Sequence, residues 1–197
     1  MDYWKSVAQR RPPGSTEFRS RNEPTMNDSR NKILFLDFDG VLHRDAVYLE
    51  HRRPVLRGSG TLFEWAPNLI SALRPHPDVQ IVLSTSWVRA RGFGRARDAL
   101  PPPLREKVIG GTWHSKMGRS EFGGFRLVDT WWDNATRFQQ IAAYIARAKT
   151  DINWLAIDDN DTGWVEENRD RLILTDSDRG LSDWRVLALL SEKLLSL

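Results

Sequence analysis

The sequence predicts an α/β fold in which helices cover both faces of a doubly wound parallel sheet. Short apolar runs alternate along the chain with stretches of helical periodicity, which is the order that successive βαβ units require. Three of these apolar runs end directly in polar clusters, as buried parallel strands do where they leave the sheet. We therefore expect one parallel sheet with a functional site at the carboxyl ends of its strands.

The first expected βα unit lies in the first half of the chain. Residues 32–36 (KILFL) form a short apolar run that is typical of a buried strand. Residues 43–60 have turn and charge character, and 62–75 carry apolar side chains at helical spacing. Pro75 and Pro77 should end that helix, because proline cannot continue it.

A second strand is expected at 79–83, where VQIVL repeats the apolar pattern. The stretch that follows, 88–100, is basic, and three prolines separate it from a third short strand at 107–113. Residues 114–133 are rich in glycine and give no clear pattern.

The last third of the chain completes the alternation. Residues 135–148 predict a helix, 153–157 and 171–175 predict strands, and a final helix should begin near Ser182. The Ser182 hydroxyl suits the N-cap of this helix, with Asp183 in its first turn. Its apolar stripe should dock on the sheet and consists of Trp184, Leu187, Leu190 and Leu194.

Composition narrows the class of protein. A chain of 197 residues can bury one sizeable core, so we expect a flexible basic arm at 1–31 followed by one domain at 32–197. The absence of cysteine excludes disulfides, thiolate metal sites and cysteine nucleophiles. No apolar run reaches the roughly 18 residues that span a membrane, and no signal peptide is visible, so we expect a cytoplasmic protein. The net charge of +3 suits an anionic partner without requiring one.

The first polar cluster is Asp37-Phe38-Asp39-Gly40, directly after the first strand. Two carboxylates this close repel each other unless a cation or a proton compensates, so they indicate a metal site. A calcium loop is the main alternative, but Val41 and Leu42 do not supply the further oxygen ligands that it needs.

Two more clusters follow later strands. Ser84, Thr85 and Ser86 come after the second strand, where hydroxyls and turn N–H groups can bind a phosphate. Asp158 and Asp159 follow the strand at 153–157, and this acidic pair again needs a cation. Because parallel strands end at the same edge of a sheet, the three clusters should form one site.

The three clusters resemble motifs of the haloacid dehalogenase-like (HAD) superfamily. The resemblance covers about residues 32–190 of the chain. The segment DFDGVL, which starts at Asp37, resembles the first motif; IVLST, ending at Thr85, the second; and LAIDD, ending at Asp159, the fourth. More narrowly, the TSW, IDDND and GLS segments resemble the HAD domains of Swiss Army Knife RNA-repair proteins.

The resemblance implies roles for the first-motif residues. Asp37 would attack phosphorus and form an aspartyl-phosphate, and Asp39 would protonate the leaving oxygen and later activate water. An acid at position 39 is typical of phosphatases and phosphotransferases and disfavours a dehalogenase.

The resemblance also implies a magnesium ion and a basic residue. Mg²⁺ would be held by Asp37, the backbone carbonyl of Asp39 and Asp158, with Asp159 as a further ligand or its support. The third-motif cation is either Arg137 or Lys116. An ordinary surface charge is an equally good interpretation of each of these two residues.

The substrate is expected to be large, because the short spacing between Asp39 and Thr85 leaves little room for a cap domain. An RNA or DNA end or a phosphoprotein would suit such an open site. Arginines after the second strand could continue an anionic track, with a solvated helix face as the alternative. These arginines are Arg89, Arg91, Arg95, Arg97 and Arg105.

Tryptophans in neighbouring segments could stack on unpaired bases, although core filling is the commoner role of such rings. They are Trp87, Trp113, Trp131, Trp132 and Trp164.

The residues expected to contact substrate are Gly40, Ser84, Ser86, Arg89 and Lys116. The sequence does not separate a phosphatase from a phosphotransferase and leaves the oligomeric state open. A non-catalytic binding module is disfavoured, because all the motif aspartates are present.

Overall fold

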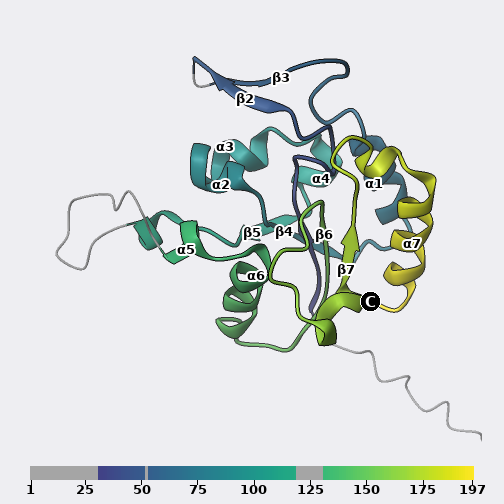
Figure 1. Cartoon of the computed structure of the whole chain (residues 1–197). Helices are drawn as coiled ribbons and strands as arrows, with labels where there is room; N and C mark the ends of the chain where they lie inside the picture. Colours follow the sequence, from purple (N-terminus) through teal and green to yellow (C-terminus); the bar gives the residue numbers. More distant parts are fainter. Residues whose placement is uncertain (1–30, 52, 119–130) are drawn as a thin grey trace, which may run out of the picture.

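A five-stranded parallel sheet forms the centre of the fold, with its strands in the order β5-β4-β1-β6-β7 (Figure 1). The computed structural model describes residues 31–51, 53–118 and 131–197. The strands are β1 (Asn31–Leu36), β4 (Gln80–Leu83), β5 (Val108–Gly111), β6 (Ile152–Asp158) and β7 (Leu172–Leu174). Every neighbouring pair in this sheet is parallel, which confirms the predicted fold class. The predicted arm, 1–31, lies outside the described residues except for Asn31.

The chain reverses its direction of travel across the sheet at β1. It passes from β1 to β4 and β5 on one side, and it returns to β6 and β7 on the other. The carboxyl ends of β1 and β6 therefore lie side by side at a topological switch point, the usual position of a site in such sheets.

Side chains on the two faces of the sheet alternate along β1. Leu34 and Leu36 belong to a large apolar cluster that also contains residues of α1 (Ala66–Leu73) and α7 (Trp184–Leu195). Ile33 and Phe35 belong to a second cluster with residues of α6 (Arg137–Ala146). The sheet is therefore covered on both faces, with α6 on one and α1 and α7 on the other (Figure 1).

Short helices and turns make the remaining connections. Between β4 and β5 lie α2 (Ser86–Arg91), α3 (Phe93–Asp98) and α4 (Pro102–Arg105). The 3₁₀ turn η1 (Ser115–Gly118) follows β5, and α5 (Trp131–Asn134) precedes α6. Two further 3₁₀ turns, η2 (Glu166–Arg171) and η3 (Gly180–Ser182), flank β7.

A β-hairpin that the sequence did not predict lies between β1 and α1. It pairs β2 (Val47–Glu50) with β3 (Arg53–Leu56) in antiparallel register. Among the described residues of that connection, β2 and β3 are the only strands and there is no helix, so no large cap is inserted there.

Two helix boundaries differ from the prediction. The helix predicted at 62–75 begins at Ala66, because Phe63 adopts a positive φ of 61°, outside the helical region. In α7 the N-cap is Asp183 rather than Ser182, and the Asp183 side chain accepts a hydrogen bond from the Arg185 N–H at 2.9 Å.

The predicted docking stripe of α7 is wrong at its first position. Leu190 and Leu194 are buried, but Trp184 is 68% exposed. Within the described ranges, no helix has both the length and the hydropathy needed to cross a lipid bilayer.

Candidate active site

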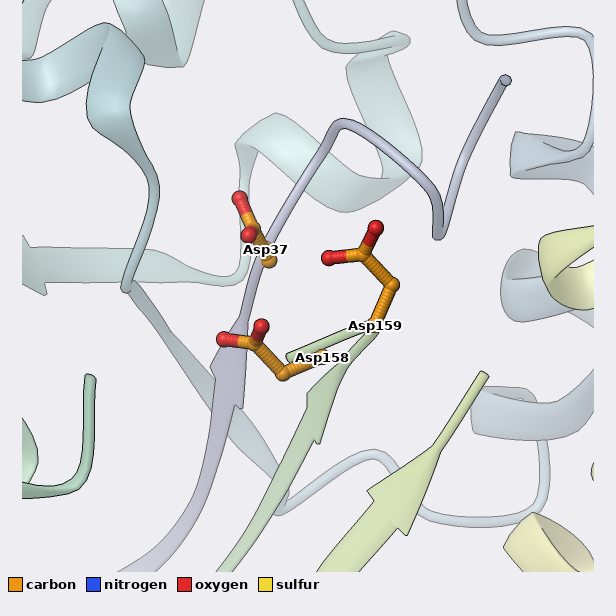
Figure 2. Close-up of side chains that lie close together, drawn as sticks. All are labelled: Asp37, Asp158 and Asp159. Carbon is orange, nitrogen blue, oxygen red and sulfur yellow. The ribbon is translucent and has the colours of Figure 1, made fainter. Parts of the chain in front are cut away.

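Three aspartates from two neighbouring strands converge at the carboxyl edge of the sheet (Figure 2). Asp37 directly follows β1, Asp158 ends β6, and Asp159 is the next residue. The Asp37 N–H donates to the Ile157 carbonyl at 3.1 Å, so the ladder between the two strands continues up to the site. One carboxylate oxygen from each aspartate lies within 4.8 Å of the others. Parallel pairing of β1 with β6 is thus what brings these side chains together.

Arg137 links two of the three carboxylates. Its Nη2 donates to Asp37 Oδ2 at 2.9 Å, and its Nε lies 2.9 Å from Asp158 Oδ2. Arg137 is the first residue of α6, and a capping box between Thr136 and Gln139 sets where that helix begins.

The two candidates for the third-motif cation differ in what the structure describes of them. The guanidinium of Arg137 lies against the aspartates, as just described. Lys116 lies in η1, and its side chain falls outside the described part of the structure. Of these two residues, only Arg137 is therefore seen in contact with the aspartates.

Burial sets the electrostatics of the site. It raises the pKa of Asp37 to about 6, with Arg137 opposing the rise and the nearby Asp39 and Asp159 adding to it. Burial, followed by the charge of Asp37, also raises the pKa of Asp158 well above its usual value. For Arg137, burial lowers the pKa, but Asp37 and Asp158 together raise it more, so the guanidinium stays charged. One guanidinium contacts two buried carboxylates, and the partly buried Asp159 lies beside them, so negative charge exceeds positive charge in the cluster.

This donor set fits a hard divalent cation. Asp37, Asp158 and Asp159 offer carboxylate oxygens within reach of one another, and Mg²⁺ prefers oxygen ligands. Such an ion would also offset the negative charge that burial makes costly. Asp39 offers no side-chain oxygen to this cluster, and its carboxylate instead contacts His43 and Trp87.

Gly40 shapes the position of Asp159. It adopts a φ of +68°, and a Cβ at this residue would overlap the Asp159 carboxylate. The Gly40 carbonyl accepts a hydrogen bond from the buried Thr175 hydroxyl at 2.8 Å. The first-motif loop is therefore fastened to the end of β7, and the missing side chain leaves room for the third carboxylate.

The second predicted cluster lies beside the end of β1. The Ser84 N–H donates to the Leu36 carbonyl at 2.8 Å, so β4 ends next to the aspartates. Thr85 is the buried N-cap of α2, and its Oγ1 accepts from the Trp87 N–H at 3.4 Å. The Ser84 hydroxyl is buried without a hydrogen-bond partner among the described residues, while Ser86 is exposed.

Acidic neighbours engage some members of the predicted arginine track. Arg89 Nε donates to Asp133 Oδ1 at 2.7 Å. The Arg97 guanidinium lies 3.0 Å from an oxygen of Asp98. Each of these carboxylates offsets one positive charge of the track, which weakens it as a site for a polynucleotide backbone.

Four of the five tryptophans considered for base stacking fill the core, which is the commoner role expected of such rings. Trp87, Trp113, Trp132 and Trp164 are buried, and only Trp131 of that set is exposed. Burial favours core filling over base stacking for these four rings. A ring packed on both faces by protein has no face left for a base.

Two contacts of the site were not foreseen in the sequence. His43 Nε2 lies 3.1 Å from Asp39 Oδ1, and Trp87 Nε1 lies 3.0 Å from Asp39 Oδ2. The signal for His43 was its place four residues after Asp39, in the same loop. Trp87 follows Thr85 by two residues, but nothing in the sequence links it to Asp39.

Comparison with known families supports this picture. The family model of the HAD domain in Swiss Army Knife RNA repair proteins matches residues 33–186. Comparisons with curated proteins and with solved structures gave no match. The matched range runs from β1 into α7 and includes the aspartate cluster, Thr85 and Arg137. The chain therefore belongs to the family of HAD domains found in Swiss Army Knife RNA repair proteins.

Proposed function

We propose that the protein is a magnesium-dependent phosphatase that forms an aspartyl-phosphate on Asp37. The observation that carries the proposal is the position of the Asp37 carboxylate, beside the Arg137 guanidinium and close to two further carboxylates at a strand end. Membership of the HAD family suggests a hydrolase of the phosphatase type. The aspartyl intermediate and the metal are the finer parts of the proposal.

In the first step, one Asp37 oxygen attacks the phosphorus of a phosphate monoester. A pKa of about 6 leaves this carboxylate ionised at neutral pH and so able to act as a nucleophile. As the new P–O bond forms, the bond to the leaving oxygen breaks, and the Asp39 carboxyl group gives that oxygen a proton. Arg137 holds the nucleophile in place through the bond from Nη2.

In the second step, water attacks the phosphorus of the aspartyl-phosphate. Asp39, now a carboxylate, takes a proton from the water as the new bond forms. The bond between phosphorus and Asp37 breaks, which releases inorganic phosphate and restores the carboxylate. Thr85 and the N–H groups around it would hold the phosphoryl oxygens.

Asp37, Asp158 and Asp159 would hold the magnesium ion, together with the Asp39 carbonyl. When bound, Mg²⁺ supplies positive charge that lowers the repulsion between the carboxylates and the anionic phosphoryl group. The structural support for this part is the excess of buried carboxylates over guanidinium groups in the cluster.

A large substrate such as a nucleic-acid end fits the site best. The described residues between β1 and α1 form only a hairpin, so no cap domain at that position encloses a small molecule. The family is named for RNA repair proteins, which favours a terminal RNA phosphate. A phosphotransferase that passes the phosphoryl group to another acceptor is the alternative, and it uses the same first step.

Phosphate release tests the proposal. We would compare p-nitrophenyl phosphate with RNA oligonucleotides that carry a 3′- or 5′-terminal phosphate, each with Mg²⁺ and with EDTA. Wild-type protein should release phosphate only with Mg²⁺, and Asp37→Asn should lower the rate roughly 10³-fold or more, because the nucleophile is lost. Asp78→Asn is the matched control, since Asp78 pairs with Lys32 at the opposite end of β1.

Each outcome separates the candidate functions. A preference for the oligonucleotides would support the RNA-end role. Consumption of the substrate with transfer to an added alcohol, in place of phosphate release, would support the phosphotransferase. A folded protein that binds Mg²⁺ but cleaves none of these phosphates would favour a non-catalytic binding module.

A further inference from the structure

The carboxylate of Asp39 has two donors that the proposed reaction does not yet explain. His43 Nε2 lies 3.1 Å from Oδ1, and Trp87 Nε1 spans both oxygens, at 3.0 Å from Oδ2 and 3.2 Å from Oδ1. The two donors come from different parts of the chain: His43 from the loop after β1 and Trp87 from α2. The His43 side chain is fully buried, and that of Asp39 is 20% exposed. A partly open carboxylate is thus held from its buried side.

The tautomer of His43 follows from its second contact. The backbone N–H of Phe63 donates to His43 Nδ1 at 3.3 Å. An amide N–H can only donate, so Nδ1 is the unprotonated nitrogen and Nε2 carries the hydrogen. His43 therefore acts as a neutral donor toward Asp39 Oδ1 and is held in this role by the main chain behind it.

The main chain at Phe63 is strained in a way that supports this contact. Phe63 has a φ of 61°, a left-handed conformation that is unfavourable for a bulky residue and is found where the surroundings enforce it. Its ring packs edge-on against Phe38, His43 and Trp87, with centroids 5.0 to 5.5 Å away. Packing in this aromatic cluster thus holds Phe63 in place, and the Phe63 N–H sets the tautomer of His43.

We propose that His43 and Trp87 are positioning residues that aim the Asp39 carboxyl group at the leaving oxygen of the substrate. This inference rests on the proposed function, in which Asp39 is the proton donor. Oδ1 accepts from His43, and the Trp87 N–H is shared by both oxygens, so Oδ2 has fewer donors and is the oxygen better placed to carry the proton. In the first step that proton moves from Oδ2 to the leaving oxygen as the P–O bond breaks, and the two donors then stabilise the resulting carboxylate.

The inference predicts a loss of rate that depends on the leaving group. A p-nitrophenolate ion leaves without protonation because it is weakly basic. An alkoxide is strongly basic and needs a proton as it leaves. We would measure kcat/KM for p-nitrophenyl, phenyl and benzyl phosphate, which have leaving groups of similar size and rising basicity. Misplacing the proton donor should lower kcat/KM for benzyl phosphate roughly 10- to 100-fold, while p-nitrophenyl phosphate changes by about twofold or less.

The informative variants are Trp87→Phe and His43→Leu, each of which removes one donor. His43→Gln is the conservative variant: its amide N–H can replace Nε2–H, so it should recover part of the benzyl phosphate rate. Trp113→Phe is the matched control, because Trp113 is also buried, at 2% exposure, and its indole N–H contacts no acceptor among the described residues. Any loss in the control should be the same for all three substrates.

The outcomes separate this inference from the function on which it rests. An active wild-type protein whose Trp87 and His43 variants lose no rate, or lose it equally for all leaving groups, would overturn the positioning role and leave the phosphatase intact. A wild-type protein inactive on all three phosphates would overturn both. A ¹⁵N NMR spectrum that shows hydrogen on His43 Nδ1 instead of Nε2 would also overturn the positioning role, without any measurement of activity.

Discussion

Arg137 Nη2 donates a hydrogen bond of 2.9 Å to Oδ2 of Asp37, the residue that directly follows the first strand of the sheet. The same guanidinium reaches Asp158 through Nε, so one cation serves two buried carboxylates. The pairing joins the start of α6 to the ends of β1 and β6. The site is therefore held together by charge as well as by the sheet, and its stability should respond to each charge separately.

Loss of Arg137 should destabilise the protein. Arg137→Met leaves Asp37 and Asp158 buried without a counter-charge, and breaking a buried ion pair in this way costs about 3 kcal/mol. Urea unfolding in EDTA at pH 7.5 measures the change in the free energy of unfolding. Arg97→Met is the control: Arg97 pairs with Asp98 on the surface, so a change of about 0.5 kcal/mol or less is expected. Equal effects of the two substitutions would contradict the role of Arg137.

The metal-free protein should lose stability as the pH rises from 4 to 7. The pKa of Asp37 is about 6 in the folded state and 3.8 in the unfolded reference. The folded state therefore holds the proton more tightly, and this contribution is complete below pH 3.8 and is lost as the pH passes through 6. The change for Asp37 amounts to about 3 kcal/mol. Asp158 acts in the same direction, because its pKa is raised as well.

Thermal unfolding in EDTA across this pH range measures the loss. The matched series in Mg²⁺ should show a larger rise in Tm at pH 7.5 than at pH 5, because a cation binds the ionised carboxylates more tightly. A Tm in EDTA that increases steadily from pH 4 to 7 would contradict the prediction.

Asp37→Asn should make the metal-free protein more stable at pH 7.5. The substitution removes a buried charge, and the amide can still accept the hydrogen bond that the Phe38 N–H donates to Oδ1 at 2.7 Å. We expect a gain of about 1 kcal/mol, smaller than the full cost of the charge, because Arg137 loses one partner. Chemical unfolding in EDTA tests the sign of the change. The same variant should gain less from Mg²⁺ than wild type, and an equal gain would show that Asp37 is not a ligand.

The sequence predicted the site best where the sheet itself brings residues together. Asp37, Thr85 and Asp158 each follow an apolar run, and parallel strands deliver such residues to one edge. The hairpin β2–β3 was not predicted, because its turn lacks the glycine or asparagine of common two-residue turns. His51 occupies this turn with a positive φ of 49°.

The partners of Asp39 could not be predicted, for a different reason. Trp87 reaches Asp39 from 48 positions away along the chain, and which way an indole points depends on the packing around it. Here that packing comes from Phe38 and Phe63, whose rings meet Trp87 edge-on. Strand periodicity carries no information about such a contact, because it lies beyond the sheet.

Gly40 and Gly58 offer a comparison between backbone strain and close approach. Both have positive φ angles, of 68° and 92°. A Cβ at Gly40 would overlap the Asp159 carboxylate, whereas a Cβ at Gly58 would meet nothing within 4 Å. Alanine at either position therefore suffers the cost of the left-handed region, about 1 to 2 kcal/mol, but only Gly40→Ala also displaces a proposed metal ligand.

Mg²⁺ affinity should therefore separate the two substitutions, although both lower the stability of the protein. Isothermal titration calorimetry should show Mg²⁺ binding to Gly40→Ala weakened roughly tenfold, since one carboxylate of three is pushed away. Gly58→Ala should bind Mg²⁺ as wild type does, while urea unfolding shows a loss of stability no larger than that of Gly40→Ala. If Gly40→Ala keeps the wild-type affinity, Asp159 does not hold the ion, and the set of side-chain ligands reduces to Asp37 and Asp158.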